Sequence, residues 1–491
     1  MIELPDDRQL TMLRDGLAGA GYYAEGIRKA LGSVRPPRPG EEQALLFRTR
    51  DRSAENAMLR LFLVGASLDE ETARQLLPTD FRAACLDLGL LEAKDGMTRS
   101  NVVIVPVEDL LFVSDAFHVL GSERAHEFVL PASTHSAQFL RQVTRRDPVD
   151  TTLDLGCGCG IQALFAARHS RSVVATDISA RAVRYTAFNA RLNGLDNVEC
   201  LRGSLFGPVE GRRFDLIVSN PPFVIGPGED YVYRDNRLEL DELVRELVRE
   251  APGYLTEGGH LQMLAEWVEF EGEPWSDRVE GWVDGTGCDT WILKSPPRRP
   301  VEYVAQRAGD VTGPLALAGR PFADWVNYFR ERKVAGIHPG MILLRRRPGP
   351  NWYNVLTLTG DVTGDCGAAV TQLVEASDFL DACDDAESLE AATLEFSPAL
   401  ELEQRLKRTG DDWEPARIVL RTTDGLPNDA EIDVPILAFL DQLDGRRSVG
   451  EVLDDFCAKT GADRAKLGPE MLGVIRLFVA RGFLEPASLD G

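Results

Sequence analysis

The sequence predicts an α/β fold in which a doubly wound, largely parallel sheet forms the centre and a smaller module lies on each side of it. Three observations indicate this fold. A short apolar strand, a glycine-rich turn and a helix follow one another between residues 151 and 168. Runs typical of strands and helices then alternate as far as residue 344, as they do when helices connect parallel strands. In the terminal segments, apolar residues recur at helical spacing over short stretches.

Residues 1–120 are expected to form the N-terminal module. Its predicted elements are three short helices, a hairpin turn and a strand, at 54–65, 68–77, 81–88, 95–96 and 101–105. The turn is indicated by the Asp95-Gly96 pair. Three helices followed by a hairpin resemble a winged helix. Some winged helices bind DNA, but the segment that would enter the groove has few basic residues, so docking or packing is favoured.

Residues 121–360 are expected to form the central domain. Its seven predicted strands lie at 151–155, 171–175, 198–202, 214–219, 260–264, 290–293 and 341–344. Apolar residues at i, i+3, i+4, i+7 and i+8 from residue 240 predict a helix between the fourth and fifth strands. A doubly wound sheet of this kind binds its ligand at the carboxyl ends of the strands.

Residues 361–491 are expected to form an acidic C-terminal module. This segment has 28 Asp and Glu against 12 Lys and Arg, within a chain whose formal charge is −24. Three apolar helical faces, at 436–443, 452–456 and 472–479, again resemble a winged helix. A strong negative field repels nucleic-acid phosphates, so this module is predicted to pack on the central domain or to dock a basic partner.

The cysteines and the apolar runs indicate a cytoplasmic protein. None of the eight Cys forms a C-x-x-C pair or lies at zinc spacing from the six His, so no metal is expected. Scattered thiols fit a reducing compartment. The first residues lack the charge and apolar pattern of a signal peptide, and no run of eighteen apolar residues occurs, so a membrane is not an expected partner.

The glycine-rich turn has the pattern Asp-x-Gly-x-Gly-x-Gly, formed by Asp154, Gly156, Gly158 and Gly160. An acid before the first glycine would repel a pyrophosphate, but it suits a ligand that carries an ammonium and a sulfonium group. The pattern resembles motif I of the class I methyltransferases, which implies S-adenosylmethionine as the cofactor. Asp177 ends the next predicted strand and is therefore expected to bind the ribose hydroxyls.

The same resemblance implies further cofactor contacts. Ile178 follows the ribose acid, and Ser204 and Leu205 follow the third strand, where this fold usually contacts the adenine. Thr134, or its neighbour Ser133, is expected to hydrogen-bond the methionine carboxylate; a helix N-cap is the alternative role for these two.

The fourth predicted strand ends at Asn220-Pro221-Pro222-Phe223. A planar amide or amino nitrogen is a poor nucleophile because its lone pair is delocalised. The Asn220 side-chain oxygen and the Pro221 carbonyl can accept its two hydrogens, while the two prolines fix the backbone and Phe223 stacks on the planar group. The tetrapeptide resembles motif IV of methyltransferases that act on planar nitrogens: release-factor glutamine N5, N6-adenine and ribosomal RNA guanine N2 enzymes.

The resemblance covers residues 121–360 and implies an N-methyltransferase of a macromolecular substrate. The acidic surface and the loop after Phe223, which resembles that of archaeal and eukaryotic release-factor enzymes, favour a protein glutamine side chain. On that loop Tyr231, Tyr233, Arg234 and Asp235 are candidate substrate contacts. The alternatives are an adenine or guanine of RNA or DNA, a small-molecule amine, and a cofactor-sensing regulator. Convergence near Asn220 of the arginines at 298–299 and 345–347 would favour nucleic acid.

Overall fold

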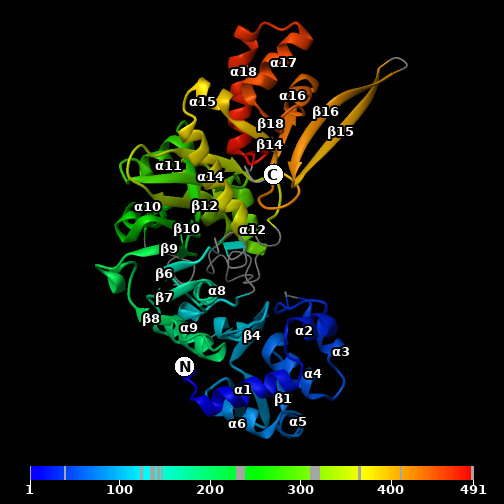
Figure 1. The fold of residues 1–491 in the computed structure, drawn as a ribbon. Coiled ribbons are helices and arrows are strands. Elements are labelled where there is room, and N and C mark those ends of the chain that lie inside the picture. The colour runs from blue at the N-terminus through cyan, green and yellow to red at the C-terminus, as the bar shows by residue number, and fades with distance from the viewer. Residues whose placement is uncertain are drawn as a thin grey trace. The chain divides into compact units, whose positions relative to one another are not determined.

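The computed structural model describes residues 2–37, 40–121, 125–132, 139–140, 144, 147–227, 238–309, 321–362, 366–409 and 412–487. The chain divides into two compact units (Figure 1). The first unit comprises residues 1–141, 147–292 and 296–353, and the second comprises 142–146, 293–295 and 354–491.

The largest sheet has eight strands in the order β13-β11-β12-β10-β9-β6-β7-β8. Their bounds are β6 Val149–Leu155, β7 Ser170–Asp177, β8 Val198–Arg202, β9 Phe214–Ser219, β10 Leu255–Phe270, β11 Cys288–Lys294, β12 Val334–Arg346 and β13 Tyr353–Thr357. β6 pairs in parallel with both β7 and β9, so the chain reverses its direction across the sheet between β6 and β9. This is the switch point at which a doubly wound sheet binds its ligand.

The prediction of seven strands was wrong by one. β13 has five residues, mixes polar with apolar side chains and lies at the sheet edge, so it lacks the long apolar run of the inner strands. The fifth strand is also longer than predicted: β10 has 16 residues, and its partner on β9 ends at Ser219, opposite Met263. Residues 264–270 therefore extend past the carboxyl end of β9 and pair with β12 alone.

Helices connect these strands within the first unit. They are α8 Ile161–Ala166, α9 Ala180–Leu192, α10 Glu242–Glu250, α11 Trp275–Val283, α12 Pro300–Gly309 and α13 Phe322–Glu331. The helix predicted from residue 240 is confirmed as α10, which buries the apolar residues at 243, 244, 247 and 248. The core that it covers includes the fully buried Trp267 of β10 and Ile217 of β9.

The N-terminal part of the first unit has six α-helices, a π-helical turn and two small sheets among its described residues. The helical segments are α1 Asp7–Gly19, α2 Ala24–Leu31, α3 Glu42–Arg48, α4 Ala54–Leu59, η1 Arg60–Val64, α5 Glu70–Leu76 and α6 Thr79–Asp87. The strands are β1 Leu68–Asp69, β2 Leu91–Lys94, β3 Met97–Ser100, β4 Val102–Val107 and β5 Leu110–Asp115. The predicted turn at Asp95-Gly96 is confirmed, because Lys94 of β2 pairs with Met97 of β3.

A polar stripe on α9 joins this N-terminal part to the central sheet. Arg181, Tyr185, Asn189 and the helix-capping Asn193 recur at every fourth position, and they bond β5 at Asp115, Val113 and Leu111, every second position. Four helical residues rise about 6 Å, and two strand residues rise about 6.6 Å. The contacts along the helix therefore stay in register with those along the strand. The side-chain amides of Asn189 and Asn193 bond the backbone N–H and C=O groups of β5.

The second unit contains α14 Gly367–Ala382, α15 Ala386–Ala391, α16 Val434–Leu440, α17 Val449–Thr460 and α18 Arg464–Ala480. It has two three-stranded sheets, with the orders β18-β14-β19 and β15-β16-β17. Their bounds are β14 Thr393–Phe396, β15 Leu400–Thr409, β16 Asp412–Thr422, β17 Asp429–Ile432, β18 Asp444–Ser448 and β19 Leu484–Pro486. The three predicted apolar faces bury residues of α16, α17 and α18 in one core. The resemblance of both terminal modules to winged helices stays a prediction.

All eight cysteines are free thiols, and seven of them are buried. No helix in the described part of the chain is both long and apolar enough to cross a bilayer. Within the same residues, no three His, Cys, Asp or Glu side chains are grouped so that they could hold a metal ion.

The buried ion pair between Asp115 and Arg181 provides a test of the α9 stripe. We expect Asp115→Ala to lower the free energy of unfolding by about 3–5 kcal/mol, because it leaves the Arg181 charge buried without its partner. The matched control is Asp109→Ala on the turn of the same hairpin, where an exposed carboxylate pairs with Arg168; its effect should stay within about 1 kcal/mol. Urea denaturation of the full chain measures both, and equal effects would contradict the anchoring role of the stripe.

Candidate functional site

The glycine turn between β6 and α8 is open on one side and closed on the other. Gly156, Gly158 and Gly160 all have positive φ, which residues with a Cβ rarely adopt. A Cβ added at Gly156 or Gly158 would meet nothing within 4 Å, whereas one at Gly160 would lie 2.8 Å from Thr186 of α9. The backbone can therefore approach a ligand at the first two glycines, while the third allows α9 to pack against the turn.

Two residues of α9 that the sequence analysis missed hold this turn from behind. Thr186 donates a hydrogen bond to the carbonyl of Gly158 at 3.1 Å, and Asn189 donates one to the carbonyl of Cys159 at 2.8 Å. The Asn189 side chain also makes two hydrogen bonds with the backbone of Val113 on β5: it accepts one from the amide and donates one to the carbonyl. The signal in the sequence was a row of polar residues at every fourth position of a predicted helix, where Asn is unfavourable unless it has a partner.

Asp177 lies at the end of β7 and faces the turn. One carboxylate oxygen accepts from the Gly158 amide at 3.0 Å, and the other accepts from the Ser179 amide at 2.8 Å. Each oxygen can accept a further hydrogen bond, so the carboxylate could also bind the two hydroxyls of a ribose. The next residue, Ile178, exposes 55% of its surface although it is apolar, which leaves a flat contact available beside Asp177.

Asp154 is buried at the end of β6 and accepts a hydrogen bond from the Ala163 amide in the first turn of α8. Burial, with a smaller contribution from the nearby Asp177, raises the pKa of this carboxyl to about 7. Burial also raises the pKa of Asp177. Neither acid forms an ion pair within the described residues, so the negative charge of the two carboxylates would favour a cation beside them.

The loop after β8 reaches the same edge of the sheet. The Gly203 amide donates a hydrogen bond to the carbonyl of Asp177 at 3.0 Å, so Ser204 and Leu205 leave the strand beside Asp177. Leu205 has a φ of 48°, an uncommon value for a side chain of this kind. The structure thus places Ser204 and Leu205 at the same edge of the sheet as Asp177 and Ile178, and their contact with the adenosine half of a ligand stays a prediction.

Asn220 leaves the sheet directly beside the glycine turn. Leu155 of β6 and Ser219 of β9 are register partners, and the Ser219 hydroxyl donates to the Leu155 carbonyl at 2.7 Å. Neighbouring strands lie about 4.8 Å apart, so Gly156 and Asn220, the next residues, begin side by side. The Asn-Pro-Pro-Phe corner therefore stands at the switch point, next to the turn.

The corner has a tight local geometry. The carbonyl of Pro221 accepts a hydrogen bond from the Phe223 amide at 2.8 Å, which orients this carbonyl. A carbonyl oxygen has two lone pairs, so one remains for another donor. Phe223 is partly buried against the core beneath β9, and Pro221 is buried.

Several predicted contacts lie outside the described residues. They are Thr134 with Ser133, and the loop candidates Tyr231, Tyr233, Arg234 and Asp235.

Residues 134–269 match a family described as the methyltransferase small domain. The chain carries a class I, S-adenosylmethionine-dependent methyltransferase domain. Residues 371–486 match a second family, described as a domain of unknown function, DUF7782. The open backbone at Gly156 and Gly158 and the two unpaired acids of the methyltransferase domain fit the cofactor of the first family.

The curated relatives of the chain include three enzymes named as methyltransferases. A ribosomal protein uL3 glutamine methyltransferase of Bradyrhizobium diazoefficiens is 34% identical over 150 residues, which are 28% of this chain and 47% of the relative. A release factor glutamine methyltransferase of Xylella fastidiosa is 40% identical and covers 23% and 46%. A ribosomal RNA small subunit methyltransferase C of Alcanivorax borkumensis is 37% identical and covers 23% and 31%. The chain thus spans a third to a half of the length of the relatives that it matches.

Among solved structures, a methyltransferase from Pyrococcus furiosus is 15% identical and covers 47% of this chain and 93% of its own, with a TM-score of 0.28.

A second group of residues that the sequence analysis missed supports the corner of the methyltransferase domain. The fully buried hydroxyl of Tyr303, on α12, accepts from the Ile225 amide at 3.1 Å and donates to Glu266 at 2.5 Å. Glu266 lies on the extended part of β10 and also pairs with Arg307. The loop then passes Trp325 so closely that a Cβ at Gly226 would overlap its ring. No local pattern in the sequence predicts this support, because Tyr303 lies 78 residues after Ile225.

The hydroxyl of Tyr303 can be removed without changing the shape of its ring. We expect Tyr303→Phe to speed amide hydrogen exchange in the segment 221–227, because the Ile225 amide loses its acceptor. The matched control is Tyr353→Phe, since the buried Tyr353 hydroxyl has no hydrogen-bond partner within the described residues. Exchange measured by mass spectrometry checks both variants. Unchanged exchange in the first variant would show that the corner does not depend on Tyr303.

Proposed function

We propose that the chain is an N-methyltransferase whose acceptor is a planar amide nitrogen, the side chain of a protein glutamine. The observation that carries this proposal is the adjacency of the Asn220 corner and the glycine turn, through the paired residues Leu155 and Ser219. A corner in this place can present hydrogen-bond acceptors to a nitrogen that lies against the cofactor's methyl group.

The chemistry of the acceptor explains the residue types. An amide NH₂ has two hydrogens, and Asn220 Oδ1 and the Pro221 carbonyl oxygen can each accept one. Held in this way, the nitrogen lone pair points away from both acceptors and toward the methyl group that S-adenosylmethionine supplies. The hydrogen bond from Phe223 to Pro221 fixes one acceptor before the substrate binds. Such orientation can lower a barrier by about 7–11 kcal/mol.

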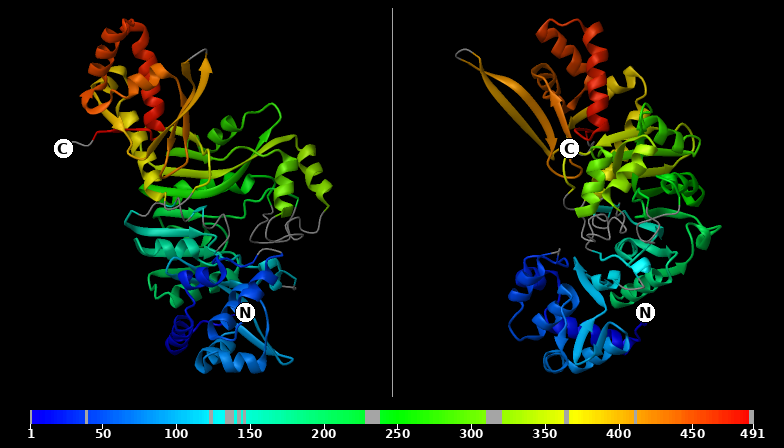
Figure 2. Two further views of the ribbon diagram at one scale, coloured as in Figure 1. Left: turned by 90° about the vertical axis from the view of Figure 1, so that its right-hand side faces the viewer. Right: turned by 180° about the vertical axis from the view of Figure 1, so that it is seen from behind.

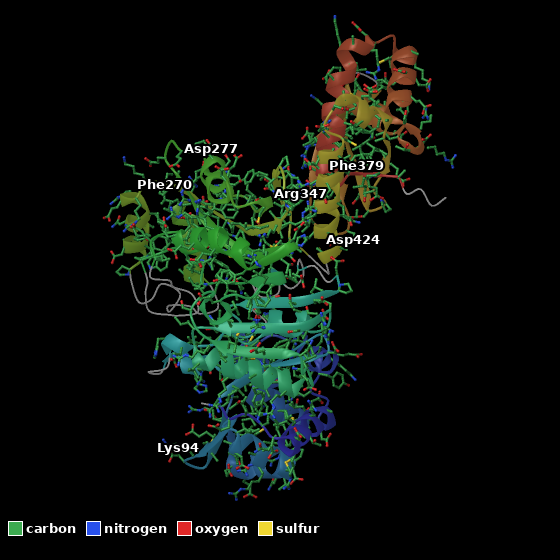
Figure 3. The ribbon with its side chains drawn as sticks, turned by 60° about the vertical axis from the view of Figure 1, so that its left-hand side comes forward. Lys94, Phe270, Asp277, Arg347, Phe379 and Asp424 are labelled. Carbon is green, nitrogen blue, oxygen red and sulfur yellow. The ribbon has the colours of Figure 1, made fainter. Side chains whose placement is uncertain are left out.

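The arginines that would have favoured nucleic acid do not converge near the corner. Arg298 bridges Ile337 at one end of β12, whereas Arg345, at the other end, lies eight residues or about 26 Å further along the strand. Arg345 and Arg347 both pair with the buried Asp289. Figure 3 shows Arg347 and Phe270, the last residue of β10, at opposite ends of these strands. This arrangement supports a protein substrate, as do two of the relatives, which are named as glutamine methyltransferases.

An exocyclic amine of RNA is the second candidate, because another relative of similar identity is named as a ribosomal RNA methyltransferase. The same acceptors would serve a guanine N2 amine. The two candidates differ in salt dependence, since binding to phosphates weakens steeply as salt is added.

The remaining parts of the chain extend this proposal. We assign residues 1–120, 121–360 and 361–491 to an N-terminal module, the catalytic domain and an acidic module, with winged-helix-like ends. In the first module, a three-stranded sheet with the order β1-β3-β2 accompanies three helical segments, which supports a winged-helix-like form. A cytoplasmic macromolecule is the proposed partner, and the terminal modules would position it.

The pKa of Asp154 predicts how cofactor binding depends on pH. A cationic ligand stabilises the ionised carboxylate and so lowers its pKa below the value of about 7 in the free protein. Binding then releases a proton, and affinity should rise with pH until it levels off above about 7. Titration calorimetry from about pH 5.5 to 8 in two buffers measures affinity and proton release. Asp154→Asn should flatten this rise, whereas Asp150→Asn, at an exposed pair with Arg171, should preserve it.

Asn220 provides the test of the reaction. We expect Asn220→Ala to reduce turnover by about 10²-fold or more, because one preorganised hydrogen-bond partner is lost, with cofactor affinity within about threefold. Asn220→Asp keeps an acceptor oxygen and should retain more activity than Asn220→Ala. The measurement is transfer of labelled methyl from S-adenosylmethionine to fractionated lysate, followed by protease or nuclease. Label in protease-sensitive material supports the glutamine proposal, and label that only nuclease releases would replace it with the RNA candidate.

A further inference from the structure

The strand β15 forms a long free edge on the second unit. Within the described residues its one strand neighbour is β16, and each residue from 401 to 409 is exposed. Figure 2 shows the hairpin of β15 and β16 extending away from the helices α16–α18 of the same unit. An exposed edge of this length offers unpaired N–H and C=O groups to another strand.

We propose that the chain forms a two-fold symmetric dimer in which the β15 strands of two copies pair edge to edge, in antiparallel register, with Gln404 on the axis. This inference does not depend on the proposed catalytic function. It rests on the register that the geometry allows and on the sequence of the strand.

Antiparallel geometry restricts the register. Successive residues of a strand direct their backbone groups to alternate edges, so residues that face outward must oppose outward-facing residues of the partner. A two-fold axis satisfies this condition when it passes through a residue, and not when it passes between two residues. The candidates near the middle of β15 are therefore axes at Glu403, Gln404 and Arg405.

Among these three, the axis at Gln404 gives complementary neighbours from residue 401 to residue 407. Glu401 opposes the partner's Lys407, Glu403 opposes the partner's Arg405, and Leu402 opposes the partner's Leu406. By symmetry each pair occurs twice, which gives four ion pairs on one face and two apolar pairs on the other. An axis at Glu403 or Arg405 would instead place two like charges on the axis itself.

The exposed side chains of the hairpin agree with this register. Leu402 and Leu406 expose 42% and 47% of their surfaces, and an apolar strand partner would cover part of both. On the other face, Arg405 lies directly opposite Arg417 of its own hairpin, a like-charge pair. The partner's Glu403 would place a negative charge beside Arg405, a charge that its own opposite residue on β16 does not supply.

A single cysteine on the axis tests the register directly. Opposed residues of an antiparallel pair have Cα atoms about 4.5–5.5 Å apart, within the range that a disulfide spans. The full-length Gln404→Cys variant should therefore form a covalent dimer under mild oxidation. In Glu401→Cys the two new thiols would lie six residues or about 20 Å apart and should not cross-link. Seven of the eight native thiols are buried, so the unmodified protein gives a low background.

Charge exchange tests the recognition. Arg405→Glu should raise the dimer dissociation constant at least about tenfold. The new carboxylate would lie opposite the partner's Glu403, and the two-fold symmetry repeats this like-charge pair. The same change removes the like-charge pair with Arg417, so weaker dimerisation would not reflect a damaged hairpin. Adding Glu403→Arg restores opposite charges and should restore the dimer. Sedimentation equilibrium at low and high salt measures the constants, and salt should weaken the dimer because exposed ion pairs are screened.

A monomer at all concentrations tested would overturn the proposal. So would a dimer that Arg405→Glu leaves unchanged, or equal cross-linking of the 404 and 401 thiols, because each result would place the contact elsewhere. Selective cross-linking at 404, together with rescue by the exchanged pair, would establish the two-fold ladder.

Discussion

The position of the glycine turn between β6 and α8 depends on the helix α9, which is held in place on two sides. Asn189 shows how this is achieved, because its amide makes three hydrogen bonds: two with the backbone of Val113 on β5 and one with the carbonyl of Cys159 in the glycine turn. Thr186, one turn earlier, bonds the same turn at Gly158. The β4–β5 hairpin of the N-terminal part is thus connected to the backbone of the glycine turn through one side chain, and the hairpin packs as part of the same fold.

The buried acids of the first unit, together with the partly buried Asp177, divide into two groups. Asp115, Asp241, Asp289 and Glu266 each pair with an arginine. Asp154 and Asp177 accept backbone amides and form no ion pair within the described residues, and burial raises the pKa of both. Burying a carboxylate without a cation is unfavourable. A fold that keeps two such groups beside an open glycine turn has negative charge available for a cationic ligand.

The sequence was sufficient wherever the structure is determined locally. The glycine turn, Asp177 and the Asn220 corner were predicted because strand, turn and helix signals lie within a few residues of each motif. What it did not predict is long-range. β13 has no apolar run of its own, the extension of β10 past β9 is visible only in the register, and the support of Ile225 by Tyr303 joins residues 78 positions apart. Pattern reasoning finds motifs, whereas the contacts that orient them come from tertiary packing.

The Asn220 corner and the elements that support the loop after it come from different parts of the chain. The match to the methyltransferase small domain ends at residue 269, at the end of the extended β10. The elements that pack against the loop after the corner, α12 with Tyr303 and α13 with Trp325, come later in the chain. The glycine turn, Asp177 and the Asn220 corner therefore all lie within the matched segment, whereas the side chains that pack against the loop after the corner come from outside it. The orientation of that loop thus depends on a part of the chain that the family match does not cover.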